Sequence, residues 1–344
     1  AENLADAGVT FHAQGDAAKE IAGGARTFKA TYTTEHVTQF TMEPMNTTAR
    51  VDGDKIELWT PSQTVGFVVG GVAAAGGFKP ENIKVNIQLL GGGYGRRVEA
   101  EYAVDAALIA KAVPGVPVKM IHTREDDFVR AKPRPATAQH LVAAVNAQGK
   151  IVGLQHRVVA EQIYARLLPG AFKASGNKDS PVMEFADGVY DIAGHHVQQL
   201  IEDRGIACSF WRGVGAGYVK FGIETLVDEV AVATNQDPLQ MRIELCNKSP
   251  RAQAVLREVA TLSNWNGPRP AGRSSANLSE NFERTTATRL PVRSTTGPPE
   301  LPGWMAAVTL KRKLPGLEVV VVRSPELGII GVGEGTTASF PRHF

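Results

Sequence analysis

Hydrophobic and polar positions alternate with a period of two over several short segments of the chain, which predicts β-strands. Two of these segments fold back around turn residues, 49–60 around Asp52-Gly53-Asp54 and 140–161 around Gln148-Gly149. Each of the two patterns predicts a β-hairpin. Single strands are expected over 82–90 and 116–123.

Helical spacing of apolar residues occurs between and after these strands. Residues 98–113 have this spacing and end at Pro114-Gly115, a typical helix stop. A second helix is predicted over 220–235, and Asp237-Pro238 begins a third. Hairpins and strands interrupted by long helices indicate an α+β fold, with mixed sheets and packed helices.

The pattern changes at about residue 266. Residues 266–300 are rich in Pro, Ser, Thr and Arg and lack apolar periodicity, which predicts a disordered linker. Within 301–344, residues 303–324 then predict a helix, a Pro-Gly turn and a buried strand, which form a short αβ appendage. The Ala/Gly-rich residues 1–29 are expected to be the tail of a preceding domain, so 30–265 form the main domain.

Composition and charge exclude several classes of function. Apolar residues make up 43% and charged residues 21% of the chain, and the net charge of +2 points neither to nucleic acid nor to an anionic membrane as a partner. No apolar run reaches the ~20 residues of a membrane span. Because Cys208 and Cys246 form no CxxC pair and the histidines have no HxxxH or HExxH spacing, no disulfide framework and no zinc or iron site are expected.

Two glycine-rich loops carry the strongest chemical signal. "GGGYGRR" (91–97) stands between a predicted strand and a helix, and "WRGVGAGY" (211–218) precedes another helix. Glycines at such places let the backbone approach a ligand, and the N–H groups of a helix start favour an anion. Arg212, beside Gly213, could hold that anion with its planar fork. Each loop could also be a plain turn, but together they favour one bound polyanion.

These motifs carry a resemblance to a known family. "FTMEPMNTTARV", "WTPSQT", "LLGGGYGRRVEAEYAVDAALIAKAVPGVPVKMIHTREDDF" and "WRGVGAGYVKFGIETLVDEVA" occur in this order. Together, over about residues 30–265, they resemble the large, molybdopterin-binding subunit of the xanthine dehydrogenase family, most closely the isoquinoline 1-oxidoreductase beta branch. The resemblance implies a bacterial protein, and it leaves the periplasm and the cytoplasm equally open as its compartment.

The resemblance implies a set of site residues and an activity. The residues that would line the molybdenum cofactor are Gly92, Gly93, Tyr94, Gly95, Arg212 and Gly213. Arg212 would also lie close to the metal and the substrate, as a catalytic candidate. The family hydroxylates N-heterocycles or aldehydes with oxygen from water, and it passes electrons to a separate iron–sulfur subunit. A glutamine of related enzymes falls near Val37 rather than at Gln39, and Glu43 is expected to be a structural acid.

Glu334, in "GVGEG", resembles the family's catalytic base. It lies only 122 positions after Arg212 (334 − 212), too few for the further cofactor-binding domain that the family places between these motifs. Its surroundings over 303–340 resemble instead the N-terminal segment of flavin-dependent tryptophan halogenases. FAD binding is not expected, because "GPPELPGW" (297–304) replaces the glycine fingerprint and Arg323 replaces the acid. Glu334 is therefore interpreted as a turn acid, in a composite chain that holds a truncated molybdenum-hydroxylase subunit, inactive or altered in activity.

Two alternatives of another class remain. Ser175-x-x-Lys178 has the spacing of hydrolases in which a lysine activates a serine, which suggests a cofactor-independent, esterase-like enzyme. The same tetrapeptide also fits a polar loop. The other alternative is a non-catalytic assembly module, whose uncovered apolar face would form a homo-oligomer.

Overall fold

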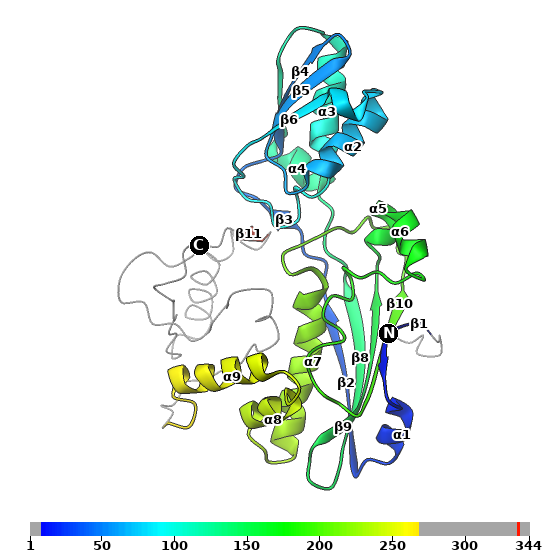
Figure 1. The fold of residues 1–344 in the computed structure, drawn as a ribbon, viewed down its shortest axis with the longest axis vertical. Helices are drawn as coiled ribbons and strands as arrows, with labels where there is room; N and C mark the ends of the chain where they lie inside the picture. The colour runs from blue at the N-terminus through cyan, green and yellow to red at the C-terminus, as the bar shows by residue number, and fades with distance from the viewer. Residues whose placement is uncertain (1–7, 268–335, 338–344) are drawn as a thin grey trace.

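The computed structural model describes residues 8–267 and 336–337. The linker was expected at 266–300, and all of it except residues 266 and 267 lies outside the described residues. The appendage at 303–324 and Glu334 also lie outside them. We call residues 42–130 the small lobe and the remainder of 8–267 the large lobe. Figure 1 shows the small lobe beyond one end of the strands that form the large lobe's sheet.

The large lobe is built on a five-stranded sheet in the order β1-β10-β9-β8-β2. Its strands are β1 Val9–Gln14, β2 Arg26–Thr34, β8 Thr137–Val145, β9 Ile151–Ala160 and β10 Gly194–Ile201. β9 and β10 are parallel, whereas β8 is antiparallel to both β2 and β9. β2, β9 and β10 therefore run in the same direction, and their carboxyl ends lie at one edge of the sheet.

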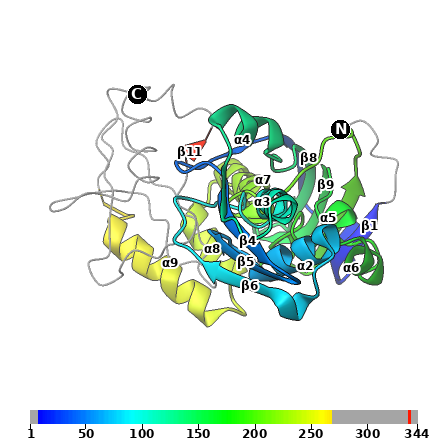
Figure 2. The ribbon, with the colours of Figure 1, turned by 90° about the horizontal axis from the view of Figure 1, so that it is seen from above.

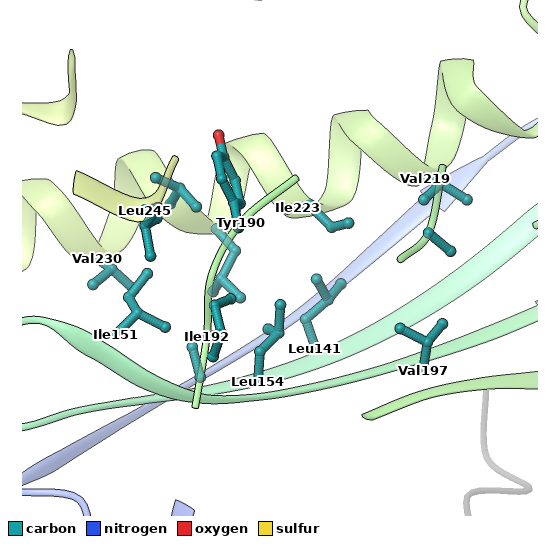
Figure 3. Close-up of a cluster of buried hydrophobic side chains, with 14 of the residues drawn as sticks. Leu141, Ile151, Leu154, Tyr190, Ile192, Val197, Val219, Ile223, Val230 and Leu245 are labelled. Atoms are coloured by element: carbon teal, nitrogen blue, oxygen red, sulfur yellow. The ribbon is translucent and has the colours of Figure 1, made fainter. Parts of the chain in front are cut away.

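One face of this sheet is covered by α7, Val214–Ala233. Apolar residues of α7 at helical spacing, such as Val219, Ile223 and Val230, pack on Leu141 and Leu154 of the sheet (Figure 3). α8, Pro238–Leu245, contacts α7, and α9, Pro250–Ser263, contacts α8. Figure 2 shows that α9 and β1 lie on opposite sides of the molecule.

The small lobe has a four-stranded sheet in the order β6-β5-β4-β7. Its strands are β4 Asn46–Asp52, β5 Lys55–Thr60, β6 Ile83–Ile87 and β7 Val118–Ile121. Two helices, α2 Val65–Gly76 and α3 Glu101–Ala112, pack on each other and on this sheet. Met45, Leu58, Val72 and Tyr102 are among the buried residues of this second core.

Short elements complete the described chain. They are α1 Ala17–Ala22, β3 Gln39–Phe40, the 3₁₀ helix η1 Pro80–Asn82, α4 Arg124–Arg130, α5 Tyr164–Leu167, α6 Pro169–Ala174 and β11 Thr336–Thr337. β11 pairs antiparallel with β3, so the segment that directly follows Gly335 returns to the junction of the two lobes.

The α+β class with mixed sheets is confirmed, and so are both hairpins and the helix that follows Asp237. Asp237 caps that helix, because its carboxylate accepts hydrogen bonds of 2.8 Å from the N–H groups of Leu239 and Gln240. The prediction for α7 was wrong at its start, which lies six residues earlier, directly after Gly213. The strand expected over 82–90 ends at Ile87, so the glycine loop is longer than the pattern indicates.

The chain before residue 30 is not a separate tail in this structure. β1 pairs with β10 at the edge of the large sheet, and β2 begins at Arg26. The boundary expected at residue 30 therefore cuts through a strand. α2 and α9 had no counterpart among the elements expected from the pattern; in α2, four glycines weaken the helical signal.

Candidate functional site at the junction of the two lobes

The two glycine-rich loops meet where the lobes join. The loop after β6 (88–100) comes from the small lobe, and the loop after β10 (202–213) comes from the carboxyl edge of the large sheet. The backbone N–H of Arg212 donates a 3.0 Å hydrogen bond to the carbonyl oxygen of Tyr94. The structure thus brings together residues that the sequence predicted for one site, although they stand more than a hundred positions apart.

The first loop is packed against the chain itself. The Gln63 side-chain oxygen accepts hydrogen bonds from the N–H groups of Gly95 (3.0 Å) and Arg97 (3.2 Å). A Cβ on Gly95 would collide with the carbonyl oxygen of Phe210, and one on Gly93 would meet the Gln63 side chain. The positive φ of 97° at Gly95 also favours glycine. Gly95 therefore permits close contact between the two loops, and Gly93 permits contact with Gln63, whereas the sequence prediction assigned this close approach to a ligand.

Two buried arginines, Arg96 and Arg97, bind this loop and its surroundings, and the sequence analysis did not identify either of them as a site residue. Arg97 is fully buried, and its guanidinium donates to the Glu43 carboxylate (2.7 Å) and to the carbonyl oxygen of Gly92 (2.8 Å). Arg96 pairs with Asp127 (3.0 Å) and with Glu101. Glu43 also accepts the N–H of Gly91 (2.9 Å), which is the structural role expected for it.

The charged run "HTREDD" (122–127) is only partly exposed to solvent, because His122 and Asp127 are buried. Thr123 caps α4 in a capping box with Asp126, whose side chain accepts the N–H of Thr123 in return. Asp127 is buried and binds both Arg96 and Arg124 (3.0 Å each). At Asp127, ion pairs inside the junction replace contact with solvent, and a sequence does not show such pairs.

The start of α7 offers an anion-binding arrangement. Gly213 precedes the helix with a φ of 81°, no side chain caps the helix, and its first turn has no acid. The Arg134 guanidinium lies 5.0 Å from the centroid of the Trp211 ring and 5.9 Å from that of the Tyr218 ring. Burial lowers the pKa of Arg134, and its Nε is buried without a hydrogen-bond partner among the described residues. Arg134 is a second cation beside the exposed Arg212, and the sequence analysis missed it.

Glu99 links the two lobes beside a small polar pocket. Its carboxylate pairs with Arg166 of α5 (2.5 and 3.1 Å) and with Lys132 (3.2 Å). Burial raises the pKa of Glu99, but the hydrogen bonds from Arg166 and Ser209 and the charge of Lys132 outweigh burial, so the pKa is lowered overall. The pocket is lined by Gln39, Arg96, Glu99, Lys132 and Ser209.

The Ser175–Lys178 pair does not have the geometry of a serine–lysine dyad. The Ser175 hydroxyl lies 2.7 and 2.8 Å from the carbonyl oxygens of Phe172 and Lys178, to which it donates, and it accepts the N–H of Lys178. The Lys178 ammonium donates instead to the carbonyl oxygen of Phe11 (3.3 Å). These contacts are those of a turn that ends α6, which corrects the hydrolase interpretation of the tetrapeptide.

The donors at the junction fit an anionic cofactor in part. Buried nitrogens of Arg96, Arg97 and Arg134 lack hydrogen-bond partners among the described residues, and the start of α7 adds N–H groups. Beside Gly93 and Gly95, by contrast, the chain's own atoms fill the space that a ligand would need. The described residues therefore fit an anion bound near Arg134 and the start of α7. The first glycine-rich loop packs beside this position and leaves no space for a ligand at Gly93 and Gly95.

Comparison with known proteins places the chain in a family. The model of the molybdopterin cofactor-binding domain matches residues 2–245, so the chain belongs to the molybdopterin cofactor-binding domain family. The tryptophan halogenase family model matches residues 301–344, of which the structure describes only 336 and 337. The resemblance to the molybdopterin-binding family that the sequence suggested is thereby confirmed. The halogenase resemblance agrees with a match that covers only this short segment.

Curated relatives agree with the first match. The beta subunit of isoquinoline 1-oxidoreductase from Brevundimonas diminuta is 36% identical over 231 residues, which cover 67% of this chain and 29% of that protein. The aldehyde oxidoreductase molybdenum-binding subunit PaoC of Escherichia coli O157:H7 is 30% identical over 230 residues, 67% of this chain and 30% of that protein. The chain therefore spans less than a third of the length of these relatives.

Solved structures share the fold. Quinoline 2-oxidoreductase from Pseudomonas putida 86 aligns with a TM-score of 0.63 and 19% identity, over 76% of this chain and 36% of that one. Aldehyde oxidoreductase from Desulfovibrio gigas aligns with a TM-score of 0.58 and 18% identity, over 76% of this chain and 30% of that one. Among the described residues, no helix is both long and apolar enough to cross a membrane.

Proposed function

We propose that this chain forms part of the molybdopterin-binding subunit of a molybdenum hydroxylase. The observation that carries the proposal is the 3.0 Å hydrogen bond from the N–H of Arg212 to Tyr94, which joins the two family motifs at the uncapped start of α7. Family membership and the match of residues 2–245 support the same assignment.

Arg134, Arg212 and the first turn of α7 would hold the anionic part of the cofactor. Arg134 is partly desolvated against Trp211 and Tyr218, so a negative charge beside it would be attracted more strongly than in water. When bound, the cofactor would supply the molybdenum centre that hydroxylates an N-heterocycle or an aldehyde with oxygen from water. Arg212, which is exposed, would then orient the small-molecule substrate or the cofactor.

Partners follow from the names of the relatives. The Brevundimonas protein is a beta subunit and the Escherichia coli protein is a molybdenum-binding subunit, so each belongs to a larger assembly. For this chain we propose an iron–sulfur subunit as the electron acceptor. Large apolar side chains on the small lobe, among them Leu89 and Val129, are exposed and could meet such a partner or a second copy of the chain.

Molybdenum and pterin content test the proposal. We expect the chain, expressed in a host that makes molybdopterin, to co-purify with molybdenum and pterin in equal amounts, measured by mass spectrometry and by fluorescence of the oxidised pterin. Arg134→Gln and Arg212→Gln should each lower both contents at least fivefold, while Arg50→Gln, on the far hairpin of the small lobe, should not. A folded chain without either component would contradict cofactor binding.

A further inference from the structure

A histidine, a glutamate and a cysteine from distant parts of the sequence meet at the carboxyl edge of the large sheet. His36 follows β2, Glu161 directly follows β9, and Cys208 lies between β10 and α7. Because β2, β9 and β10 run in the same direction, these three positions share one edge. One potential ligand atom from each side chain lies within 4.8 Å of the other two.

The cluster contains an unsatisfied buried group. Glu161 is only 4% exposed, and one of its oxygens, Oε1, lies 3.0 Å from His36 Nε2. The other oxygen, Oε2, is buried and has no hydrogen-bond partner among the described residues. A buried carboxylate oxygen without a partner is costly, so its retention points to a positive group that is bound there.

We propose that His36, Glu161 and Cys208 bind one divalent transition-metal ion of the zinc type. Imidazole nitrogen, thiolate sulfur and carboxylate oxygen form the mixed donor set that zinc accepts, and they are poorly suited to magnesium or calcium. The ion would take the place of the His36–Glu161 hydrogen bond, and the thiol proton of Cys208 would leave to solvent. None of these three residues is among those proposed to hold the molybdenum cofactor, although Cys208 lies in the same loop as Arg212.

The spacing of the three groups is close to what an ion requires. Two nitrogen or oxygen ligands on a tetrahedral zinc stand about 3.3 Å apart, and a sulfur stands about 3.6 Å from either of them. The His36–Glu161 separation of 3.0 Å already lies near that value. The remaining separations, at most 4.8 Å, need to shrink by no more than about 1.2 Å, which side-chain rotation supplies. The His36 side chain is 27% exposed, which leaves access for the ion and a water as fourth ligand.

A nucleophilic cysteine triad would use the same three residue types, but the environment of the thiol disfavours it. Cys208 is fully buried, and burial, together with the nearby Glu161, raises the pKa of its thiol to about 12. Reactive cysteines need an accessible thiolate at neutral pH, so a free nucleophile at this position would be largely inactive.

Cobalt(II) tests the proposal through a signal that only a thiolate–metal bond produces. The full chain, freed of metal by chelator dialysis, should bind one equivalent of Co²⁺ with sulfur-to-cobalt charge-transfer absorption and the visible bands of a four-coordinate ion. Added Zn²⁺ should abolish both. Cys208→Ala should remove the charge-transfer band and weaken binding at least tenfold.

Cys246→Ala is the matched control, because Cys246 is also a fully buried cysteine but lies at the C-cap of α8, outside the cluster. It should bind Co²⁺ like the parent chain. Glu161→Gln keeps an acceptor for His36 but removes the charge, and should weaken binding at least tenfold even if Cys208→Ala fails to fold. Equal Co²⁺ spectra for Cys208→Ala and Cys246→Ala, or no uptake of either metal by the folded parent chain, would overturn the proposal.

Discussion

Arg97 shows how much of the junction depends on single side chains. Its guanidinium lies beneath the first glycine-rich loop and binds the Glu43 carboxylate as well as the carbonyl oxygens of Glu43 and Gly92. The hydrogen bonds thereby join the turn before β4 to the loop after β6. A buried charge of this kind is tolerated only because its partners are in place.

Replacing Arg97 by methionine should destabilise the protein strongly. The change leaves the carbonyl oxygen of Gly92 without the Arg97 donor and leaves the Glu43 carboxylate with only the N–H of Gly91. We expect a loss on the order of 2–4 kcal/mol in the free energy of unfolding. The lower part of this range allows for the partial exposure of Glu43. Urea unfolding followed by circular dichroism measures the loss.

Arg50→Met is the matched control, since the Arg50–Asp52 pair (2.9 Å) is exposed on both sides. A change within about 0.5 kcal/mol is expected for it. If Arg97→Met were as mild as this control, the buried contacts would not support the loop.

At the scale of elements, α7 connects the core to the candidate site. Its apolar side packs on the large sheet, while its first residues lie beside Arg134 and Trp211. The helix starts at Val214, directly after Gly213, because the positive φ at Gly213 turns the chain away from the preceding loop. The pattern of apolar residues alone placed this start six residues too late, since the first turn is rich in glycine.

Two glycine-to-alanine changes in this region should shift the free energy of unfolding in opposite directions. Gly213 has a φ of 81°, so alanine is strained there and should cost about 1–2 kcal/mol. Gly217 lies on an exposed side of α7, where a Cβ would meet only the end of the Arg134 side chain at 3.6 Å. Gly217→Ala should therefore stabilise by up to about 1 kcal/mol, since alanine favours the helix.

Thermal unfolding of the two variants, measured side by side by circular dichroism, checks this pair. If both variants shifted the melting temperature by the same amount in the same direction, the placement of Gly217 within α7 and of Gly213 directly before it would be contradicted.

For the molecule as a whole, the core of the large lobe encloses groups that can take up protons. Burial, together with the charge of Lys220 and the neighbouring His195, lowers the pKa of His156 to about 3. Burial, together with His12, Lys220 and His196, lowers the pKa of His195 to about 3 as well. Both imidazoles are therefore neutral in the folded protein at neutral pH, and His156 Nε2 lies 3.0 Å from the side-chain oxygen of Gln139.

These two histidines predict a loss of stability in mild acid. A histidine in the unfolded chain has a pKa near 6.5, so between about pH 6.5 and pH 3 the unfolded chain binds more protons than the folded protein. The free energy of unfolding should therefore fall as pH falls through this window, by on the order of 2 kcal/mol per histidine between pH 7 and pH 4.5.

Urea unfolding at pH 7 and pH 4.5 measures this loss of stability. His195→Asn should reduce the loss by the contribution of one histidine, on the order of 2 kcal/mol. His196→Asn, at the next and only partly buried position, serves as the control and should retain most of the loss. The explanation fails if His195→Asn loses as much stability in acid as the parent chain.

The sequence by itself determined the local structure and the ancestry of the chain. Period-two patterns around Gly53 and Gly149, and the Asp237-Pro238 helix start, depend on neighbouring residues only, so they could be predicted. The motifs around Tyr94 and Arg212 likewise pointed to the family, because each is a run of adjacent residues. What they could not show is that Gly95 faces the backbone of Phe210 rather than open space.

Tertiary structure alone decided which distant residues meet. The pairing of Arg97 with Glu43, the position of Arg134 beside Trp211 and the cluster of His36, Glu161 and Cys208 all depend on strand direction and on the contact between the lobes. These contacts join positions tens to more than a hundred residues apart, and no local spacing encodes them. Burial then sets their chemistry, because removal from water determines whether a charge is paired, a thiol is protonated or a carboxylate needs a cation.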